Sequence, residues 1–316
     1  AYGRYVPLAM SGSESWVASE LGFQNIGPNY WKGEDGRLAL IGGQERLDNP
    51  QYVKVFEELA RWRAYLGEGG EGRDYATTNE LFTSGKAAFY AAGSWEIAPF
   101  TGKVDFGVMR PPVAKQGDGC FFTDHTDIGM GMNPASKNKE AAMTFLQWLT
   151  TSQFAELYTN SLPGFFSLSN HFFEATNPAA KEMMEWRDQC DSTIRVATQI
   201  LSRGTPKLGD ELAEVSQSVL LGTMAPQAAA DRLEQGLKGW YAPHQSQQGK
   251  ALDCQCAAPA AVSAAPATVE SVIAAPSAAI STELNASPVP AAVAPSAAAS
   301  PDVEQALASE LEAPQP

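Results

Sequence analysis

Apolar residues recur at helical spacing along much of the chain, and the segments that they mark are its predicted helices. The first begins after Asn49, which can cap it, carries Pro50 in its first turn, and ends at Gly67. A second runs to about residue 149, because Ala141, Phe145 and Leu149 share one face. Further helices are predicted over 78–83, 152–158, 179–190, 210–221 and 226–241.

Four short apolar runs are predicted to be strands, over 38–41, 86–91, 105–109 and 127–132. Proline ends two of them, since Pro111 follows the third and Pro134 follows the fourth. Residues 1–36 are rich in Gly, Ser and aromatic residues and are expected to form loops with short helical pieces. Strands interleaved with helices predict an α/β architecture.

The chain changes character near residue 246. Residues 251–316 contain 22 Ala, nine Pro and no Lys or Arg, and the last aromatic residue of the chain is Tyr241. Such a segment cannot bury enough apolar surface to offset the loss of chain entropy. We therefore expect a folded part over 1–245 and a disordered, acidic Ala/Pro tail over 246–316.

The charge balance excludes some partners. The chain has 22 Lys+Arg against 36 Asp+Glu, a net charge of -14, so it lacks the basic stripe that a nucleic acid requires. The chain holds no run of about 18 apolar residues that could span a membrane. Residues 1–10 do not have the order of an export signal, so we expect that the true start was removed or that the chain is a fragment.

The cysteines are spaced neither as a zinc site nor as a disulfide framework. Cys120 and Cys190 are interpreted as buried small apolar residues, and Cys254 and Cys256 as exposed residues of the tail. The spacing of the cysteines does not decide whether the protein works in an oxidising or a reducing compartment.

The common catalytic motifs are absent from the sequence, among them the nucleophile elbow, the phosphate-binding loop and the zinc-protease helix. Residues 136–139 match the Ser-x-x-Lys pattern, but they are interpreted as the polar start of a helix. With 36 carboxylates, no particular pair stands out as a glycosidase dyad. The sequence therefore predicts no catalytic residue, no cofactor and no resident metal.

The densest polar cluster is Asp124-His125-Thr126-Asp127. It is interpreted first as a polar loop that enters a strand, and second as a ligand contact. A metal site is the third alternative, and it would need further ligands, whereas His171 and His244 are far away in sequence.

Aromatic residues in loops give the best functional signal. Trp16, Tyr30, Trp31 and Trp95 lie in segments rich in Gly and Ser, where either the core or a ligand must cover the rings. Sugars fit this role, because their C–H faces stack on rings while their hydroxyls bond to polar side chains. Trp95 favours ligand contact, since it follows Gly-Ser at a predicted strand end. The tryptophans predicted to lie on helices are assigned to packing: Trp62, Trp148, Trp186 and Trp240.

Several motifs, in order, resemble one family. Residues 82–89 with Gly93-Ser94-Trp95 resemble an F-x-x-G-K-A-A-M … G-x-W passage. The other matching segments are 107–112, 129–142, 145–149, 162–164, 222–229 and 237–241. Together they resemble the carbohydrate-binding proteins of ABC importers, the extracellular solute-binding family that includes maltose-binding protein.

The resemblance implies a periplasmic-binding-protein-like two-lobe fold of type II, apparently without most of the first lobe. It implies that residues 1–103 form a second-lobe α/β segment and that 104–160 cross to the first lobe. Residues 161–245 would then return to the second lobe as helices.

The resemblance also implies a function. A mono- or oligosaccharide would be captured between two lobes joined by a hinge, and the closed protein, a monomer in the periplasm or another extracytoplasmic space, would dock on the permease subunits of an ABC transporter. Trp95 would stack on the sugar. The other implied ligand contacts are Trp16, Glu14, Ser13, Asp124, His125 and Phe165. The alternatives are a secreted glycan-active enzyme and a non-transport interaction module with the tail as a tether.

Overall fold

The computed structural model describes residues 5–124, 128–167, 173–197 and 199–245. The chain divides into two units, Ala1–Asp253 and Cys254–Pro316, and all described residues belong to the first. The predicted disordered tail over 246–316 lies outside the described residues.

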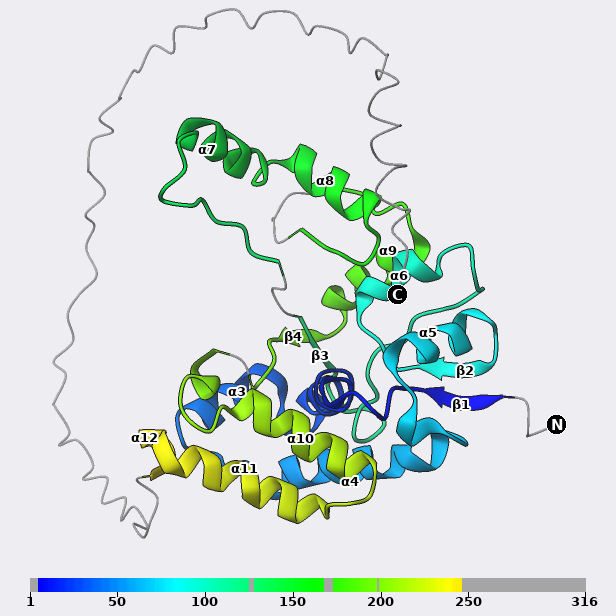
Figure 1. The fold of residues 1–316 in the computed structure, drawn as a ribbon, viewed down its shortest axis with the longest axis vertical. Coiled ribbons are helices and arrows are strands. Elements are labelled where there is room, and N and C mark those ends of the chain that lie inside the picture. The colour runs from blue at the N-terminus through cyan, green and yellow to red at the C-terminus, as the bar shows by residue number, and fades with distance from the viewer. Residues whose placement is uncertain (1–4, 125–127, 168–172, 198, 246–316) are drawn as a thin grey trace, which may run out of the picture. The chain divides into compact units, whose positions relative to one another are not determined.

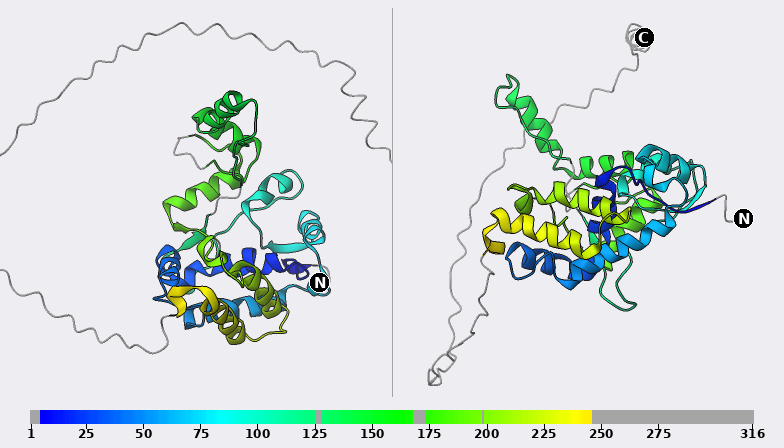
Figure 2. Two further views of the ribbon diagram at one scale, coloured as in Figure 1. Left: turned by 60° about the vertical axis from the view of Figure 1, so that its left-hand side comes forward. Right: turned by 60° about the horizontal axis from the view of Figure 1, so that its bottom comes forward.

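Four helices build the core. They are the π-helix η1 (Val17–Phe23) and the α-helices α4 (Pro50–Trp62), α10 (Leu208–Leu220) and α11 (Pro226–Trp240). Each turns an apolar face inward, and the buried residues include Phe56 of α4, Leu212 of α10 and Leu233 of α11. Helices α10 and α11 pack beside α4, as Figures 1 and 2 show. The predictions of α4, α10 and α11 are confirmed.

Three short helices follow η1: α1 (Gln24–Ile26), α2 (Pro28–Trp31) and α3 (Gly33–Ile41). The predicted strand over 38–41 is therefore wrong, because these residues form the last turn of α3. Leu40 is buried and Leu38 is exposed, and the Gly42 N–H donates to the Leu38 carbonyl at 2.8 Å. A run of four apolar residues carries no period, so tertiary packing decided its conformation.

The first strand pair is parallel. Strand β1 (Val6–Ala9) pairs with β2 (Ala87–Tyr90), with Leu8 opposite Phe89. Helix α5 (Tyr75–Thr83) precedes β2, and the Asp74 side chain caps it by accepting from the Thr77 N–H at 2.8 Å. The predicted strand over 86–91 is confirmed, whereas β1 was expected to be a loop.

The second strand pair is also parallel and joins β3 (Phe121–Thr123) to β4 (Asp191–Thr193). The Asn29 side chain holds β3 at Phe121 through two hydrogen bonds. Its Nδ2 donates to the Phe121 carbonyl at 2.9 Å, and its Oδ1 accepts from the Phe121 N–H at 2.8 Å. The predicted strands over 105–109 and 127–132 are wrong for the residues that the structure describes, which form no ladder there. An apolar run becomes a strand only when a neighbouring strand supplies its hydrogen bonds.

Cys120 and Cys190 form a disulfide that joins the segments leading into β3 and β4. Their interpretation as separate apolar cysteines was wrong, although Cys190 is buried. The two residues lie 70 positions apart, so only the pairing of β3 with β4 brings them together.

The remaining helices of the described residues are short α-helices and 3-10 helices. The α-helices are α6 (Ile97–Phe100), α7 (Lys139–Trp148), α8 (Ser152–Ser161), α9 (Pro178–Glu185) and α12 (Ala242–Gln245). The 3-10 helices are η2 (Arg63–Tyr65), η3 (Gly70–Gly72), η4 (Ser94–Glu96), η5 (Trp186–Asp188) and η6 (Gln199–Ser202). Helices α7, α8 and α9 were predicted, and α9 is shorter than expected because its last turn tightens into η5.

Candidate ligand site

The aromatic and acidic residues of interest follow the carboxyl ends of the first strand pair. Glu14 and Trp16 come after β1, and Trp95 and Glu96 come after β2. Because β1 and β2 are parallel, both segments leave the sheet at the same edge. Loops at this edge of parallel sheets are the common place for ligand sites.

Gly93 makes room for the indole of Trp95. A Cβ atom at Gly93 would lie 2.1 Å from Cζ3 of the Trp95 ring, a distance that no side chain permits. Trp95 belongs to the short helix η4, and its ring therefore lies against the backbone of Gly93, which has no side chain. Trp95 remains half-buried and packs against the edge of the core. This contact is the physical reason for a Gly-x-Trp order at this position.

Tyr75 links Trp95 to a buried carboxylate. The Trp95 indole N–H donates to the Tyr75 hydroxyl at 2.9 Å, and that hydroxyl donates to Glu96 Oε1. The Asn79 amide donates to Glu96 Oε2 at 2.7 Å. The side chain of Glu96 is 5% exposed and accepts bonds on both oxygens. Since the indole N–H is occupied by Tyr75, only the ring of Trp95 remains for other contacts.

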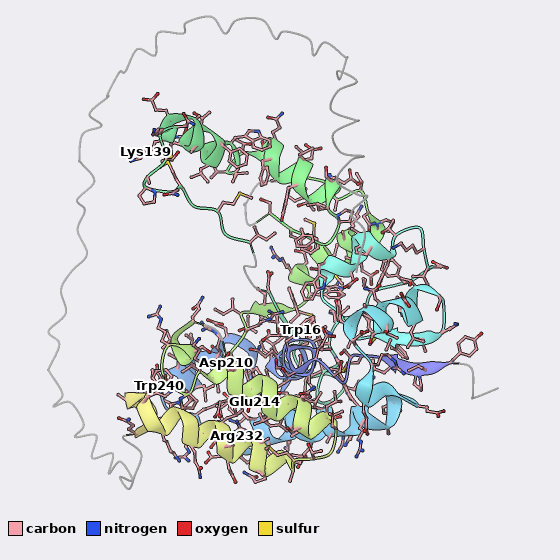
Figure 3. All side chains as sticks on the ribbon, in the orientation of Figure 1. Trp16, Lys139, Asp210, Glu214, Arg232 and Trp240 are labelled. Atoms are coloured by element: carbon pink, nitrogen blue, oxygen red, sulfur yellow. A yellow bond between two sulfur atoms is a disulfide. The ribbon has the colours of Figure 1, made fainter. Side chains whose placement is uncertain are left out.

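The segment after β1 completes the same cluster. The Trp16 ring is 36% exposed and lies 5.0 Å from the Tyr75 ring, between centroids. Glu14 accepts from the Tyr75 backbone N–H and from the Ser11 hydroxyl at 3.0 Å. Ser13 instead donates to the Arg73 carbonyl at 3.1 Å, so its hydroxyl serves the loop. Figure 3 shows Trp16 beside η1.

Two tyrosines of the cluster are held in their neutral form. Burial, then the hydrogen bond to Glu96, raises the pKa of Tyr75 to about 12. Burial and the neighbouring Tyr75 hydroxyl raise the pKa of Tyr90, with the charges of Glu96 and Glu14 adding to the effect. Both hydroxyls therefore stay protonated over the physiological range and can donate hydrogen bonds. We name Trp16, Tyr75, Tyr90 and Trp95, with Glu14 and Glu96, the aromatic–acid cluster.

A hollow of about 1970 Å³ opens beside this cluster. Its lining includes Tyr90, Trp95 and Glu96 from the first strand pair, and Asp124 and Phe165. Gly164, with φ +101°, lies against the Ser94 carbonyl, where a Cβ atom would come within 1.8 Å of the oxygen. The close approach of this glycine brings the Phe165 loop next to η4. The structure thus places Trp95, Asp124 and Phe165 along one hollow.

Asp124 lies at the carboxyl end of β3. Its backbone N–H donates to the Thr193 carbonyl at 2.7 Å, and its carboxylate pairs with Arg187. His125 lies outside the described residues. In the part of the chain that the structure describes, no group of three or more His, Cys, Asp or Glu side chains is placed to hold a metal ion.

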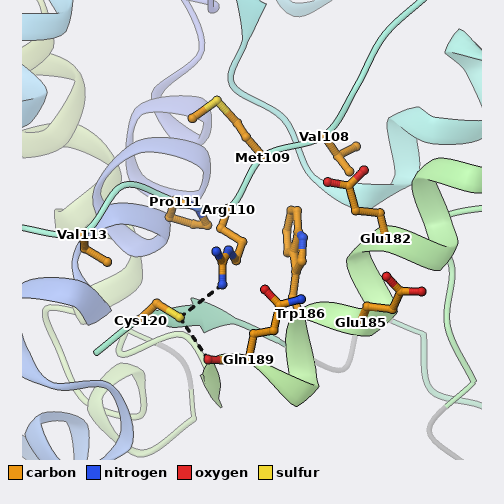
Figure 4. Close-up of a pocket in the computed structure, with 10 residues that line it drawn as sticks. All are labelled: Val108, Met109, Arg110, Pro111, Val113, Cys120, Glu182, Glu185, Trp186 and Gln189. Carbon is orange, nitrogen blue, oxygen red and sulfur yellow. Dashed lines mark hydrogen bonds between the residues drawn. The ribbon is translucent and has the colours of Figure 1, made fainter. Parts of the chain in front are cut away.

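A second pocket, of about 430 Å³, lies beside the disulfide. Figure 4 shows Trp186 in its wall, with Arg110 and Cys120 on one side of the ring and Glu182 and Glu185 on the other. The Arg110 guanidinium donates to the Cys190 sulfur at 2.9 Å. Trp186 was predicted to be a packing residue, and it packs edge-on against Phe122 while also lining this pocket.

Other aromatic residues from the sequence serve the core. Trp31 is buried and stacks on Tyr52 with ring centroids 5.2 Å apart, and Tyr30 packs against the same core. The ligand alternative for Trp31 is therefore wrong, because its ring is buried in the core. Trp240, at the end of α11, packs against the core and donates to the Pro206 carbonyl at 3.0 Å, as predicted for a packing tryptophan (Figure 3).

Tyr75, Tyr90 and Glu96 were missed by sequence reasoning. Glu96 follows Trp95 directly, and this adjacency was the available signal. Tyr75 is the first residue of α5, and nothing local to it indicates that its hydroxyl reaches Trp95.

The chain is similar to known binding proteins. Residues 2–156 match the family model described as bacterial extracellular solute-binding protein. A chitin oligosaccharide binding protein is similar in structure, with a TM-score of 0.62 and 21% identity over 74% of this chain and 59% of that one.

Two further solved structures agree in fold. One, described with xylan utilization by the thermophilic bacterium Caldanaerobius polysaccharolyticus, has a TM-score of 0.58 and 15% identity over 73% of this chain and 61% of that one. The other is a bacterial solute receptor that prefers β-D-galactopyranose, with a TM-score of 0.57 and 18% identity over 75% of this chain and 61% of that one. The chain therefore spans about three fifths of the length of these structures, and its fold is that of periplasmic binding proteins.

Among the described helices, none has the length and hydropathy that crossing a bilayer requires.

Proposed function

Because residues 2–156 match the model of the bacterial extracellular solute-binding protein family, we propose that this chain binds a mono- or oligosaccharide and delivers it to the permease of an ABC importer. The observation that carries this proposal is the aromatic–acid cluster beside the hollow. It combines ring faces with carboxylates and tyrosine hydroxyls, which is the chemistry that a sugar requires.

In this proposal the sugar stacks on Trp95 and is held by polar groups at the ring edge. Trp95 offers its face because Tyr75 occupies the indole N–H at 2.9 Å. Glu14, Glu96 and Asp124 supply acceptors for sugar hydroxyls, and Phe165 covers one side. Trp16 adds a second ring at the rim of the cluster. Every step is binding, and no bond in the sugar is broken.

Transport would follow from closure around the ligand. A ligand that contacts two lobes favours the closed state by its differential affinity for that state. We place residues 1–103 and 161–245 in one lobe and 104–160 in the crossing to the other, on the strength of the sequence resemblance. The closed form would be the one that docks on the permease.

The disulfide supports an extracytoplasmic location. Disulfides persist in oxidising compartments such as the bacterial periplasm and are rare in the cytosol. Cys120 and Cys190 are joined in this way at the entry to β3 and β4.

The test is a sugar titration followed by tryptophan fluorescence. A panel of neutral, amino and acidic oligosaccharides is titrated into the full chain and into Trp95→Ala, with Trp148→Ala as the control because Trp148 lies on α7 outside the cluster. We expect a response in the chain and in Trp148→Ala, and none in Trp95→Ala. A response that survives in Trp95→Ala, or the absence of any response across the panel, contradicts the proposal.

A further inference from the structure

The aromatic–acid cluster contains two carboxylates with no cationic partner. Glu14 accepts from the Tyr75 N–H and from Ser11, and Glu96 accepts from the Tyr75 hydroxyl and Asn79. The donor group is uncharged in each of these four hydrogen bonds. Among the residues that the structure describes, no Lys, Arg or His pairs with either carboxylate.

The nearby arginines are committed elsewhere. Arg73 donates to the carbonyls of Leu66 at 3.0 Å and Glu68 at 3.1 Å. Around the hollow, Arg187 pairs with Asp124, and Arg195 pairs with Glu20 at 2.7 Å.

Arg110 is the remaining cation on the wall of the hollow, and its guanidinium faces the disulfide sulfurs. The three arginines that line the hollow thus have partners other than Glu14 and Glu96.

Both carboxylates contact Tyr75, Glu96 through the tyrosine hydroxyl and Glu14 through the backbone N–H. Burial and the Tyr75 hydroxyl raise the pKa of Tyr90 most, and the charges of Glu96 and Glu14 act in the same direction. On Tyr75 the charge of Glu96 acts in the same direction. The faces of Trp16, Trp95 and the tyrosines add the negative side of their quadrupoles to the same region.

We infer that the aromatic–acid cluster selects a sugar that carries an ammonium group, that is, an amino sugar or an oligosaccharide of amino sugars, and that it rejects acidic sugars. This inference rests on the proposed sugar-binding function and names its substrate class. An ammonium group in the hollow gains from the rings of Trp95 and Tyr90 through cation–π attraction and from the negative charge of Glu96, which lines the same hollow. A uronate would bring its carboxylate toward Glu96, which has no cationic partner among the described residues.

The experiment compares four tetrasaccharides by calorimetry on the full chain at about pH 6, where amines of this kind are protonated. The probes are tetramers of glucosamine, of N-acetylglucosamine, of glucose and of galacturonate. We expect the glucosamine tetramer to bind roughly tenfold more tightly than the glucose tetramer. Its advantage should shrink toward unity at about pH 9, because the amine then loses its proton.

Two variants connect this preference to the cluster. Glu96→Gln keeps the shape of the side chain and removes its charge, so the preference for the glucosamine tetramer should fall several-fold. Glu80→Gln, on an exposed position of the same helix as Tyr75 and Asn79, should leave the preference unchanged.

The outcomes separate the two proposals. Binding of the glucose tetramer without a preference for the glucosamine tetramer overturns this inference and leaves sugar binding intact. The inference is also overturned if the galacturonate tetramer binds as tightly as the glucosamine tetramer or more tightly. It is overturned as well if Glu96→Gln keeps the full preference for the glucosamine tetramer, and in both cases sugar binding stays intact. Failure of all four tetramers to bind contradicts sugar binding itself.

Discussion

The indole N–H of Trp95 and the hydroxyl of Tyr75 lie 2.9 Å apart in a hydrogen bond, and Tyr75 passes the bond on to Glu96. The direction of this chain is fixed, because an indole nitrogen can only donate and an ionised carboxylate can only accept. Tyr75 therefore positions the ring of Trp95 through its hydroxyl. The relationship joins Tyr75 of α5 to Trp95 and Glu96 of η4, which lie 20 and 21 positions later in the sequence.

Tyr75→Phe removes that hydroxyl and leaves the Trp95 N–H and one Glu96 oxygen without their partner. We expect the free energy of unfolding to fall by about 1–3 kcal/mol, the cost of unsatisfied buried polar groups. Urea unfolding followed by fluorescence measures this. Tyr5→Phe is the matched control, since Tyr5 is 64% exposed, and an equal loss in both variants would contradict the positioning role.

Gly93→Ala is expected to displace the Trp95 ring. The added Cβ would lie 2.1 Å from Cζ3, so either the ring or the backbone has to move. The sugar response should weaken by roughly tenfold or more, because a misplaced ring loses its stacking geometry. The emission maximum of Trp95 should shift as its surroundings change.

The control for this variant is Gly239→Ala on α11, outside the lining of the hollow, where an added Cβ meets nothing within 4 Å. Sugar binding and fluorescence should match those of the unchanged chain. A Gly93→Ala protein that binds sugar as the parent does would show that the contact between Gly93 and the indole is irrelevant to the site.

The contact between His244 and Glu234 is expected to stabilise the fold less at alkaline pH. His244 is buried, its Nδ1 lies 3.1 Å from both Glu234 oxygens, and its Nε2 lies 2.7 Å from the Leu40 carbonyl. Both nitrogens face acceptors, so the imidazolium form satisfies both. Burial acts to lower the pKa of His244, but the hydrogen bonds to Glu234 and Leu40 outweigh it, and the pKa is raised.

Other charges surround this pair. Arg46 lies 3.7 Å and Lys238 lies 3.8 Å from Glu234 Oε1, and Arg46 also pairs with Asp48. The Leu47 N–H donates to Glu234 Oε2 at 3.0 Å. Arg46, Lys238 and the Leu47 N–H thus all face the Glu234 carboxylate, and the charge of Arg46 acts to lower the pKa of His244.

The sign of the pH dependence follows from the raised pKa. The stabilisation is complete below the ordinary histidine pKa and is lost as the pH rises through the folded-state value. His244→Gln should lower stability by about 1.5–3 kcal/mol at acidic pH, with a smaller effect at alkaline pH. Thermal melts across the pH range measure this, and a variant whose deficit grows with pH contradicts the charged pair.

Reduction of the Cys120–Cys190 disulfide is expected to destabilise the second strand pair. The bond closes a loop of 70 residues, for which the loss of chain entropy in the unfolded state corresponds to about 4 kcal/mol. Hydrogen exchange at the amides of β3 and β4 should rise in a Cys120→Ser, Cys190→Ser protein.

The cysteines of the tail provide the control for this experiment. Cys254→Ser with Cys256→Ser should leave exchange in β3 and β4 unchanged. Protection that is identical in all three proteins would contradict a structural role for the disulfide.

Helices were the part of the fold that local sequence could predict. In α4, α10 and α11 apolar residues recur every three or four positions over 13 to 15 residues, so one face is defined without knowledge of its neighbours. Strands were less predictable. β1 and β3 span four and three residues, too few to display a period, and each exists because a distant strand completes its hydrogen bonds.

The site divides in the same way. A ring after Gly-Ser at a strand end marked Trp95, since glycine permits the close approach that the indole makes to residue 93. The sequence alone thus determined the long helices α4, α10 and α11 and the class of fold. Only the tertiary structure decided that Tyr75 reaches that ring, that Trp31 is buried and that Cys120 meets Cys190. These contacts join residues far apart in the chain, and their geometry is set by packing rather than by local preference.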